Sequence, residues 1–550
     1  MSAVRRTVRI VSGVGVLALA GGVVVLGQGD VLPASPADAR VVSAGTVVDV
    51  PPSPARLVCA GPLVLPDQAQ SSDDAFDPVP VDPLESLSVV ATTSAGGAVT
   101  SLDGGDVLDR IGAGPARLVQ RAAGRATRVV ADPTDVPAQV AGAGSSLVTA
   151  GDLRGLAAAS CQVPTTDAWL VGGSTELGST SLLVLQNPGS TPAVVHLEAF
   201  GATGPVDLDT EQYLVAPGAE RVVVLGGIAA QERRVAVHVT ATGGRVAAFV
   251  QDSTLDGFTP TGTELVAAGA PPARRQVVPG VVLRETGVDD PDAGLLRLLA
   301  PGDAAVTAHV RLLGPDGVAD LPGADALTLE PGVVTDVPLG GLAAGAYTVV
   351  VDADGAVVAS VMVARPGDPT EQDPSVPTRE RAWAPSVLPV PAVLTGGSSD
   401  DPDDPDDAAA ARPGAPLVVV PDRTSGTLVL GAVAGTTPDG VLDGTGRLTG
   451  TLEVLGPDGT VVAEEPVDLP VGRTQAWRLA DLAPDGTRAS GARFVPAGSS
   501  AGASAVWPAA GLVAQVDRAD GTLLSVLVPV ASGTGTTTTT VVHDPRAGTR

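Results

Sequence analysis

Short apolar stretches with alternating polar positions recur along this chain, and turn-forming residues separate them. Two such stretches, Ser181 to Gln186 and Ala193 to Phe200, are rich in Val and Leu and flank the segment Asn187-Pro188-Gly189-Ser190. Alternation at period two is typical of half-buried β-strands, and Asn, Pro and Gly favour turns. The pattern predicts a β-hairpin, with Asn187 and Pro188 as structural turn residues and Asn187 in an Asx-type turn.

The same succession of strand, Gly-Pro turn, strand and glycine turn occurs three times. The Gly-Pro turns are Gly204-Pro205, Gly314-Pro315 and Gly456-Pro457, and an apolar stretch precedes each of them. A repeated unit of about 100 residues built from short strands predicts tandem β-sandwich modules of the immunoglobulin-like type. We place three modules at residues 166–270, 276–380 and 381–530.

Residues 51–165 carry a weaker pattern. Ser86 to Thr93 and Arg128 to Ala131 have the composition of strands, whereas residues 151–159 suggest a short helix. We expect an N-terminal β region that is tied to the first sandwich. Because runs with a 3.6-residue period are few, the chain is predicted to be all-β, with tandem sandwiches after one N-terminal transmembrane helix.

The N-terminal residues 1–27 predict a membrane anchor. Ile10 to Gly27 is uncharged and apolar, and as a helix it would span about 27 Å at a rise of about 1.5 Å per residue. Arg5, Arg6 and Arg9 precede it, which predicts a cytoplasmic amino terminus and a single-pass protein of the cell membrane with the bulk of the chain extracytoplasmic. A cleaved signal peptide is the alternative, although the candidate site Ala37-Asp38-Ala39 lies far downstream.

Three segments have the composition of linkers. Residues 28–50 are rich in small residues and proline, the loop 396–416 holds aspartates broken by prolines, and the tail 531–550 is of low complexity. Such composition predicts a solvated linker, a solvated loop and a disordered tail. Calcium binding by the acidic loop is an alternative, although the loop lacks the ordered ligand spacing of an EF-hand.

Composition and charge exclude some classes of function. With a net charge of −28 and no lysine, the chain has no basic stripe for phosphates, so we expect no nucleic-acid partner. The histidines form neither an H-E-x-x-H motif nor a Cys/His zinc spacing. They are His196, His238, His309 and His543. We therefore expect no metal, no cofactor, no catalytic residues and no enzyme.

Cys59 and Cys161 are the only cysteines of the chain. Export would place both in an oxidising compartment, and each stands beside an apolar β-like run. We predict a disulfide between them, with free core thiols as the alternative.

Two segments carry a resemblance to a known family. They are Cys161 to Pro188, reading CQVPTTDAWLVGGSTELGSTSLLVLQNP, and Cys59 to Leu63, reading CAGPL. Together with the N-terminal anchor, they resemble an actinobacterial family known as domain of unknown function 5719. The resemblance implies a membrane-anchored, extracytoplasmic protein without an assigned activity, and it associates the chain with envelope glycan enzymes.

Two hypotheses of function follow. The first is a non-catalytic, extracytoplasmic, membrane-anchored scaffold or accessory protein of the bacterial cell envelope, with an envelope protein or a glycan as partner. The alternative is a cell-wall glycan-acting enzyme or a glycan-binding module. A pocket holding two or more carboxylates with strongly perturbed pKa values would favour the enzyme. The tryptophans, which sugar binding would use, are expected in core or interdomain packing. They are Trp169, Trp383, Trp477 and Trp507.

Overall fold

The computed structural model describes most of the chain. The described residues are 46–65, 81–121, 124–288, 290, 292–319, 321, 323–370, 374–387, 415–435, 446–497, 506–530 and 537–541. The chain divides into two compact units, one of residues 51–536 and one that joins residues 1–50 with residues 537–550.

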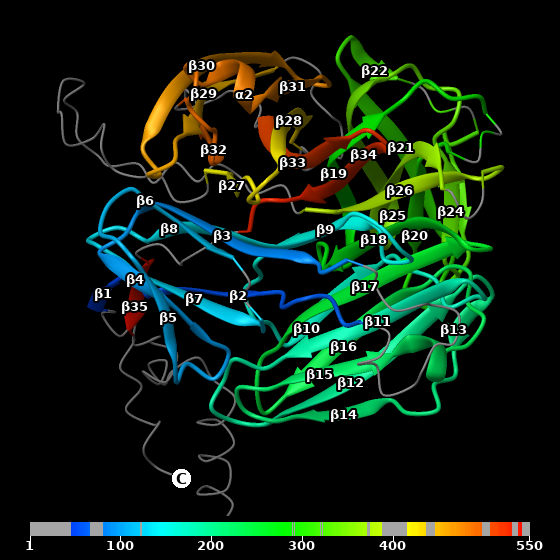
Figure 1. Ribbon diagram of the computed structural model, residues 1–550, viewed down its shortest axis with the longest axis horizontal. Helices are drawn as coiled ribbons and strands as arrows, with labels where there is room; N and C mark the ends of the chain where they lie inside the picture. The colour runs from blue at the N-terminus through cyan, green and yellow to red at the C-terminus, as the bar shows by residue number, and fades with distance from the viewer. Residues whose placement is uncertain are drawn as a thin grey trace, which may run out of the picture. The chain divides into compact units, whose positions relative to one another are not determined.

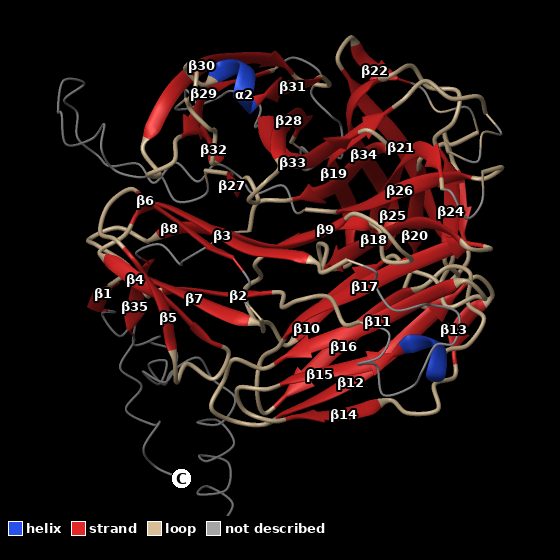
Figure 2. Cartoon of the chain, in the orientation of Figure 1, coloured by secondary structure: helices blue, strands red, loops and turns tan. Residues whose placement is uncertain are grey.

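The regular secondary structure of the described residues is almost entirely β, as Figure 2 shows. Within them, helix is confined to the 3-10 turn η2 (Leu225–Gly227) and the single turn α2 (Leu479–Leu482). The all-β prediction is confirmed. No described helix is long and apolar enough to cross a bilayer, and the segment from Ile10 to Gly27 lies outside the described residues.

The unit of residues 51–536 contains four copies of one two-sheet arrangement, which we call sandwiches I to IV (Figure 1). Sandwich I comprises β2 (Ala55–Cys59), β3 (Leu84–Thr93), β4 (Gly96–Ser101), β5 (Val107–Ile111), β6 (Ala116–Arg121), β7 (Thr127–Asp132), β8 (Gln139–Val148) and β9 (Gly155–Ser160). Sandwich II comprises β10 (Asp167–Val171), β11 (Ser179–Gln186), β12 (Ala193–Gly201), β13 (Gly204–Val206), β14 (Gln212–Val215), β15 (Glu220–Val224), β16 (Ala236–Thr242), β17 (Ala247–Asp256) and β18 (Thr259–Ala267).

The remaining strands form the other two copies. Sandwich III comprises β19 (Ala273–Leu283), β20 (Leu295–Leu299), β21 (Val306–Gly314), β22 (Gly317–Ala319), β23 (Leu327–Leu329), β24 (Thr335–Pro338), β25 (Gly345–Pro369) and β26 (Pro377–Pro385). Sandwich IV comprises β27 (Leu417–Val419), β28 (Ser425–Ala434), β29 (Arg447–Leu455), β30 (Val461–Pro470), β31 (Thr474–Arg478), β32 (Gly491–Pro496), β33 (Val506–Arg518) and β34 (Gly521–Leu527).

The strand order is the same in every copy. In sandwich II one sheet runs β10-β16-β12-β13 and the other β15-β11-β17-β18, and sandwich I repeats this order as β2-β7-β4-β5 and β6-β3-β8-β9. In sandwich III the two sheets share the 25-residue strand β25, which pairs with β19 and β21 in its first half and with β20 and β26 in its second. Residues 51–165, which were expected to form an N-terminal β region tied to the first sandwich, therefore contain a complete fourth sandwich.

The two sheets of a copy enclose one apolar core. In β12 the inward residues Val195 and Leu197 alternate with the outward residues His196 and Glu198, and the inward side chains pack against the opposite sheet at Leu183. This is the alternation that the sequence displays, because one face of each outer strand meets the core and the other meets solvent.

The expected hairpin at Asn187 is wrong. β11 pairs with β15 and β17, whereas β12 pairs with β14 and β16 in the opposite sheet. The segment between them thus crosses from sheet to sheet. The reason lies in burial: Ser181–Gln186 is buried at every position, as in a strand covered on both faces, while β12 alternates.

Three further expectations need correction. Residues 155–160 form the strand β9 instead of part of a helix. Sandwich III extends to Pro385, beyond the expected boundary at residue 380, because β26 pairs with β25. The immunoglobulin order places the first two strands in one sheet, but here they lie in opposite sheets, as β10 and β11 do.

The four sandwiches close into a ring. The last strands of the copies form its centre, where β9 packs on β18, β18 on β26, β26 on β34 and β34 on β9. Apolar clusters extend across the junctions: one contains Val58 of sandwich I and Phe249 of sandwich II, and another contains Leu417 of sandwich IV and Val90 of sandwich I. Sandwich IV therefore contacts sandwich I, as each copy contacts the one that follows it.

An arginine of each sandwich donates an Nη1–H to the next sandwich in this ring. The pairs are Arg128 with the carbonyl oxygen of Pro188 at 3.4 Å, Arg234 with that of Val334 at 3.5 Å, Arg275 with that of Ala434 at 2.9 Å, and Arg493 with Oε1 of Gln139 at 3.0 Å. Polar contacts thus repeat around the ring together with the apolar ones.

The second unit contains a two-stranded sheet. β1 (Thr46–Val50) pairs antiparallel with β35 (Thr537–Val541). A strand therefore occurs within the predicted linker 28–50 and another within the tail that was expected to be disordered. Residues 396–414 of the acidic loop lie outside the described residues, as do 28–45, 531–536 and 542–550.

Candidate functional site

The centre of the ring brings together four edge strands, and edge strands carry unpaired backbone groups. An N–H or C=O buried without a partner is costly, so these groups require acceptors and donors from elsewhere. Two buried glutamates meet this need: Glu264 on β18 and Glu380 on β26, both 1% exposed.

Glu380 of sandwich III holds sandwiches I and IV together. Its Oε1 accepts the N–H of Leu156 on β9 at 2.8 Å and the N–H of Leu524 on β34 at 3.3 Å. These two N–H groups belong to edge strands on opposite sides of the first-to-last junction. One side chain therefore accepts a backbone N–H from each of two other copies.

Glu264 of sandwich II makes a parallel set of contacts. Its Oε1 accepts the N–H of Ala158 on β9 at 3.2 Å and the hydroxyl of Ser525 on β34 at 3.0 Å, besides the N–H of Leu265 at 2.7 Å. Ser525 in turn donates to the carbonyl oxygen of Ala158, an arrangement in which its single hydroxyl proton is shared between the two acceptors. All four sandwiches thus meet in one polar cluster.

Burial keeps both carboxyls protonated over an unusually wide pH range. It raises the pKa of Glu380 to about 8, although hydrogen bonds from Leu156 and Leu524 lower it in part. It also raises the pKa of Glu264 well above its ordinary value. The Oε2 atoms of both side chains are buried without a partner. These carboxyls are sealed among strands, and their raised pKa values follow from burial of the carboxyl groups at the centre of the ring.

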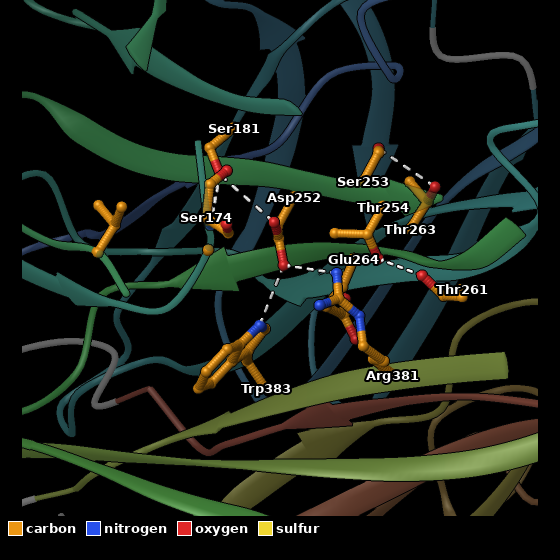
Figure 3. A network of polar contacts seen from close by, with 12 residues as sticks. Ser174, Ser181, Asp252, Ser253, Thr254, Thr261, Thr263, Glu264, Arg381 and Trp383 are labelled. Atoms are coloured by element: carbon orange, nitrogen blue, oxygen red, sulfur yellow. Dashed lines mark hydrogen bonds and ion pairs between the residues drawn. The ribbon is translucent and has the colours of Figure 1, made fainter. Parts of the chain in front are cut away.

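A third buried acid joins sandwiches II and III, as Figure 3 shows. Oδ2 of Asp252 on β17 accepts the Nη2–H of Arg381 at 2.9 Å and the Nε1–H of Trp383 at 3.2 Å, both from β26. Its Oδ1 contacts the hydroxyl of Ser181 at 3.3 Å. A fully buried aspartate is tolerated here because a guanidinium and two neutral donors surround it.

Another candidate site is a groove of about 640 Å³ where sandwich II meets sandwich III. Its floor is the outer face of the sheet that contains β10, β16 and β12. The ring of His238 stacks on Trp169 with centroids 4.1 Å apart. Nδ1 of His238 lies 2.7 Å from Oε2 of Glu198, and its Nε2 lies 3.2 Å from Oδ2 of Asp167.

The structure contains the predicted disulfide between Cys59 and Cys161. Cys59 ends β2 and Cys161 follows β9; both are buried in the core of sandwich I, and their Cα atoms are 4.1 Å apart. The neighbouring backbone pairs as well, since Val58 and Gln162 exchange N–H···O bonds of 2.8 and 2.7 Å. The bond therefore fastens the first strand of sandwich I to the segment that leads into sandwich II.

Asn187 is fully buried at the crossing between the two sheets of sandwich II. Its Oδ1 accepts the N–H of Gly189 at 2.9 Å, which is the contact of an Asx-type turn. Its Nδ2 donates to the carbonyl oxygens of Thr191 at 2.8 Å and Val215 at 3.1 Å. The carbonyl of the adjacent Pro188 accepts from Arg128 of sandwich I, so this turn also takes part in a junction.

The three described histidines do not come together as one site, and His543 lies outside the described residues. His196 and His238 both line the groove, whereas His309 is an exposed residue of β21 whose Nδ1 contacts the carbonyl oxygen of Asp325. Among the described residues no group of three or more His, Cys, Asp or Glu side chains could hold a metal ion.

Three of the four tryptophans are at least nine-tenths buried. Trp169 belongs to the apolar junction of sandwiches II and III, Trp383 packs into the core of sandwich II from the neighbouring β26, and Trp477 lies in the core of sandwich IV. Trp507 is half-buried.

Sequence reasoning missed Glu264 and Glu380. The available signal was a glutamate inside a strand of otherwise uncharged residues, as in Thr259–Ala267, which reads TPTGTELVA. A charged residue in the middle of such a strand, at a position that turns out to be buried, requires a partner.

A match to a protein family shows to which family this chain belongs. Residues 118–397 match the Family of unknown function (DUF5719), which is more than half of the 550-residue chain. The chain belongs to this family. In this DUF5719 chain the matched residues begin in β6 of sandwich I and include all of sandwiches II and III.

Other similarities to the DUF5719 chain are few. No curated protein matches it significantly. Among solved structures, the crystal structure of Thermotoga maritima 1070 is similar at 15% identity, covering 20% of this chain and 92% of that chain, with a TM-score of 0.16.

Proposed function

We propose that this DUF5719 chain is a non-catalytic scaffold or accessory protein of the bacterial cell envelope, anchored in the cell membrane by Ile10 to Gly27 with the ring of sandwiches outside the cytoplasm. The apolar segment and the arginines that precede it support the anchor and its orientation. The disulfide between Cys59 and Cys161 is compatible with an oxidising, extracytoplasmic compartment.

The observation that carries the scaffold role is the closed ring. Four copies of one sandwich are fastened through apolar clusters at their junctions and through Glu264 and Glu380 at their centre. Such a unit holds its surface loops at fixed separations, which suits a protein that positions partners. The carboxyls with raised pKa values at this centre are buried beneath the strands, so they favour a structural role over glycan cleavage.

Two experiments on cells test the proposal. External protease applied to intact cells should remove the sandwiches and leave a short N-terminal fragment in the membrane. In-cell crosslinking followed by purification of the full chain should capture an envelope protein, and a variant truncated after residue 50 should not capture it. Recovery of the protein from the cytosol, or release of sugar from purified cell wall by the full chain, would contradict the proposal.

A further inference from the structure

The groove between sandwiches II and III concentrates negative charge. Its lining includes three carboxylates: Glu198 on β12, Glu211 before β14, and Asp303 in the loop that precedes β21 of sandwich III. The described residues that line it include no arginine, and the chain has no lysine. Two sandwiches therefore present acids to the same space without a guanidinium or ammonium group among the lining residues.

From this geometry we propose that the groove binds an organic cation, an ammonium or guanidinium group carried on an apolar stem. The inference goes beyond the scaffold role and does not depend on it. A cation placed between Glu198 and Asp303 would be attracted by acids from both sandwiches. Charge complementarity is thus the first reason for the choice of ligand.

The apolar part of the groove suits the stem of such a ligand. Pro205, Val206 and Leu208 line the groove on the side of sandwich II, and all three keep some exposure to solvent. An aliphatic chain that ends in a cation can pack along apolar surface while its charged head reaches the carboxylates. This combination of surfaces matches an arginine side chain or an alkyl amine.

The state of the aromatic residues argues against a sugar. Saccharides stack on an open aromatic face, but Trp169 is only 5% exposed and His238 already stacks on it. Phe200, the other aromatic residue of the groove, is 8% exposed. Without an open platform, the groove offers carboxylates and an apolar wall instead.

Two histidines line the groove, and one of them positions a carboxylate. His238 contacts both Glu198 and Asp167, and its stacking on Trp169 restricts the ring, so it holds the carboxylate of Glu198 in place. His196 lines the same groove, and its Nδ1 is buried without a partner.

Calorimetric titration of the purified full chain tests the proposal with matched probes. The first is acetyl-Gly-Arg-Gly amide, and its control is the citrulline peptide of the same length, which keeps the shape and loses the charge. Spermidine serves as a free polyamine, and a trimer of N-acetylglucosamine as a saccharide. Since exposed ion pairs are screened by salt, binding of the cations should weaken clearly between about 0.05 and 0.5 M salt.

The variant Glu198→Gln/Glu211→Gln/Asp303→Asn removes the three charges at nearly constant shape. We expect it to bind the arginine peptide at least about tenfold more weakly, which corresponds to about 1.4 kcal/mol. The matched control is Glu464→Gln, an exposed strand glutamate of β30 outside the groove, and it should bind like the wild type. An unchanged thermal unfolding curve would show that the triple variant is folded.

Each outcome decides the matter. Tighter binding of the arginine peptide than of spermidine identifies the cation as a polypeptide side chain. Tighter binding of spermidine identifies it as a free amine. Both results support the proposal. The proposal is wrong if the citrulline peptide or the saccharide binds as well as the arginine peptide, if no cation binds, or if the triple variant and Glu464→Gln lose affinity equally.

Discussion

Arg154 of sandwich I donates its Nε–H to Oδ2 of Asp520 in sandwich IV at 3.1 Å, across 366 positions of the chain. Its Nη2–H reaches the carbonyl oxygen of the same residue at 3.2 Å. The side chain of Arg154 is only 4% exposed, whereas that of Asp520 is 39% exposed. This pair fastens the first sandwich to the last beside the central glutamates.

Replacement of Asp520 by Asn should lower the free energy of unfolding, because it leaves a buried guanidinium with a neutral partner. Breaking a fully buried pair costs more, but solvent reaches Asp520, so we expect a loss of about 1–2 kcal/mol in urea unfolding. Asp468→Asn is the matched control, since Asp468 pairs with Arg447 at the surface. If Asp520→Asn and Asp468→Asn lowered the free energy of unfolding equally, the pair at the junction would contribute no more than an ordinary surface ion pair.

Stability should fall as the pH rises from about 4.5 to about 8. The ordinary pKa of Glu380 is 4.5 and its folded pKa is about 8, so in this window the unfolded chain has lost a proton that the folded chain keeps. Each such carboxyl contributes up to about 1.4 kcal/mol per pH unit, and Glu264 acts in the same direction. The contribution of these carboxyls to the free energy of unfolding is fully present below about pH 4.5 and is lost above about pH 8.

The double variant Glu264→Gln/Glu380→Gln tests this pH dependence. Glutamine retains an oxygen for the N–H groups of β9 and β34 but does not ionise, so the fall in stability should flatten. Urea unfolding measured at half-unit steps between pH 4.5 and 9 gives the slope, and Glu464→Gln should keep the slope of the wild type. A double variant with an unchanged slope would refute the role of the central carboxyls.

The disulfide should contribute measurably to stability. It closes a loop with a sequence separation of 102, and in the chain-entropy model a loop of about 100 residues gives up to about 4.7 kcal/mol. Cys59→Ala/Cys161→Ala should therefore unfold at lower urea concentration. Mass spectrometry of a non-reduced digest should show the two cysteine peptides linked, and free thiols on both residues would contradict the bond.

Gly155 marks a place where β9 approaches β18 too closely for a side chain. A Cβ at this position would lie 2.7 Å from both the backbone nitrogen and the backbone oxygen of Thr263. Gly155→Ala should separate the strands and cost about 1–3 kcal/mol, measured as a lower urea midpoint. At Gly112 the nearest atom to an added Cβ is 3.9 Å away, so Gly112→Ala should unfold like the wild type.

The sequence allowed the strands to be recognised but not which sheet each one joins. The alternation of β12 predicts a strand, and Asn187 predicts a turn, because both signals are local. Whether the turn connects neighbours in one sheet or crosses to the other depends on partners such as Val222 and Val250, which lie opposite Val184 and Leu183. Those partners come from distant parts of the chain.

Sandwich I and the central cluster were harder to recognise. Ala157, Ala158 and Ala159 favour a helix in isolation, yet they form an edge strand because β8 pairs with it and strands of two other copies, β18 and β34, pack on it. Likewise Glu380 is needed only once Leu156 and Leu524 have been brought to it from more than 100 positions away. No local pattern contains that requirement.

The contact of sandwich IV with sandwich I has a consequence for self-association. Each junction joins one face of a copy to a different face of the next, a heterologous contact, and such contacts grow into fibres unless they close. Here Val90 of the first copy and Leu417 of the last already lie in one buried apolar cluster. A chain shortened by one sandwich would expose two mutually complementary surfaces on every molecule, so the number of copies itself protects the protein from polymerising.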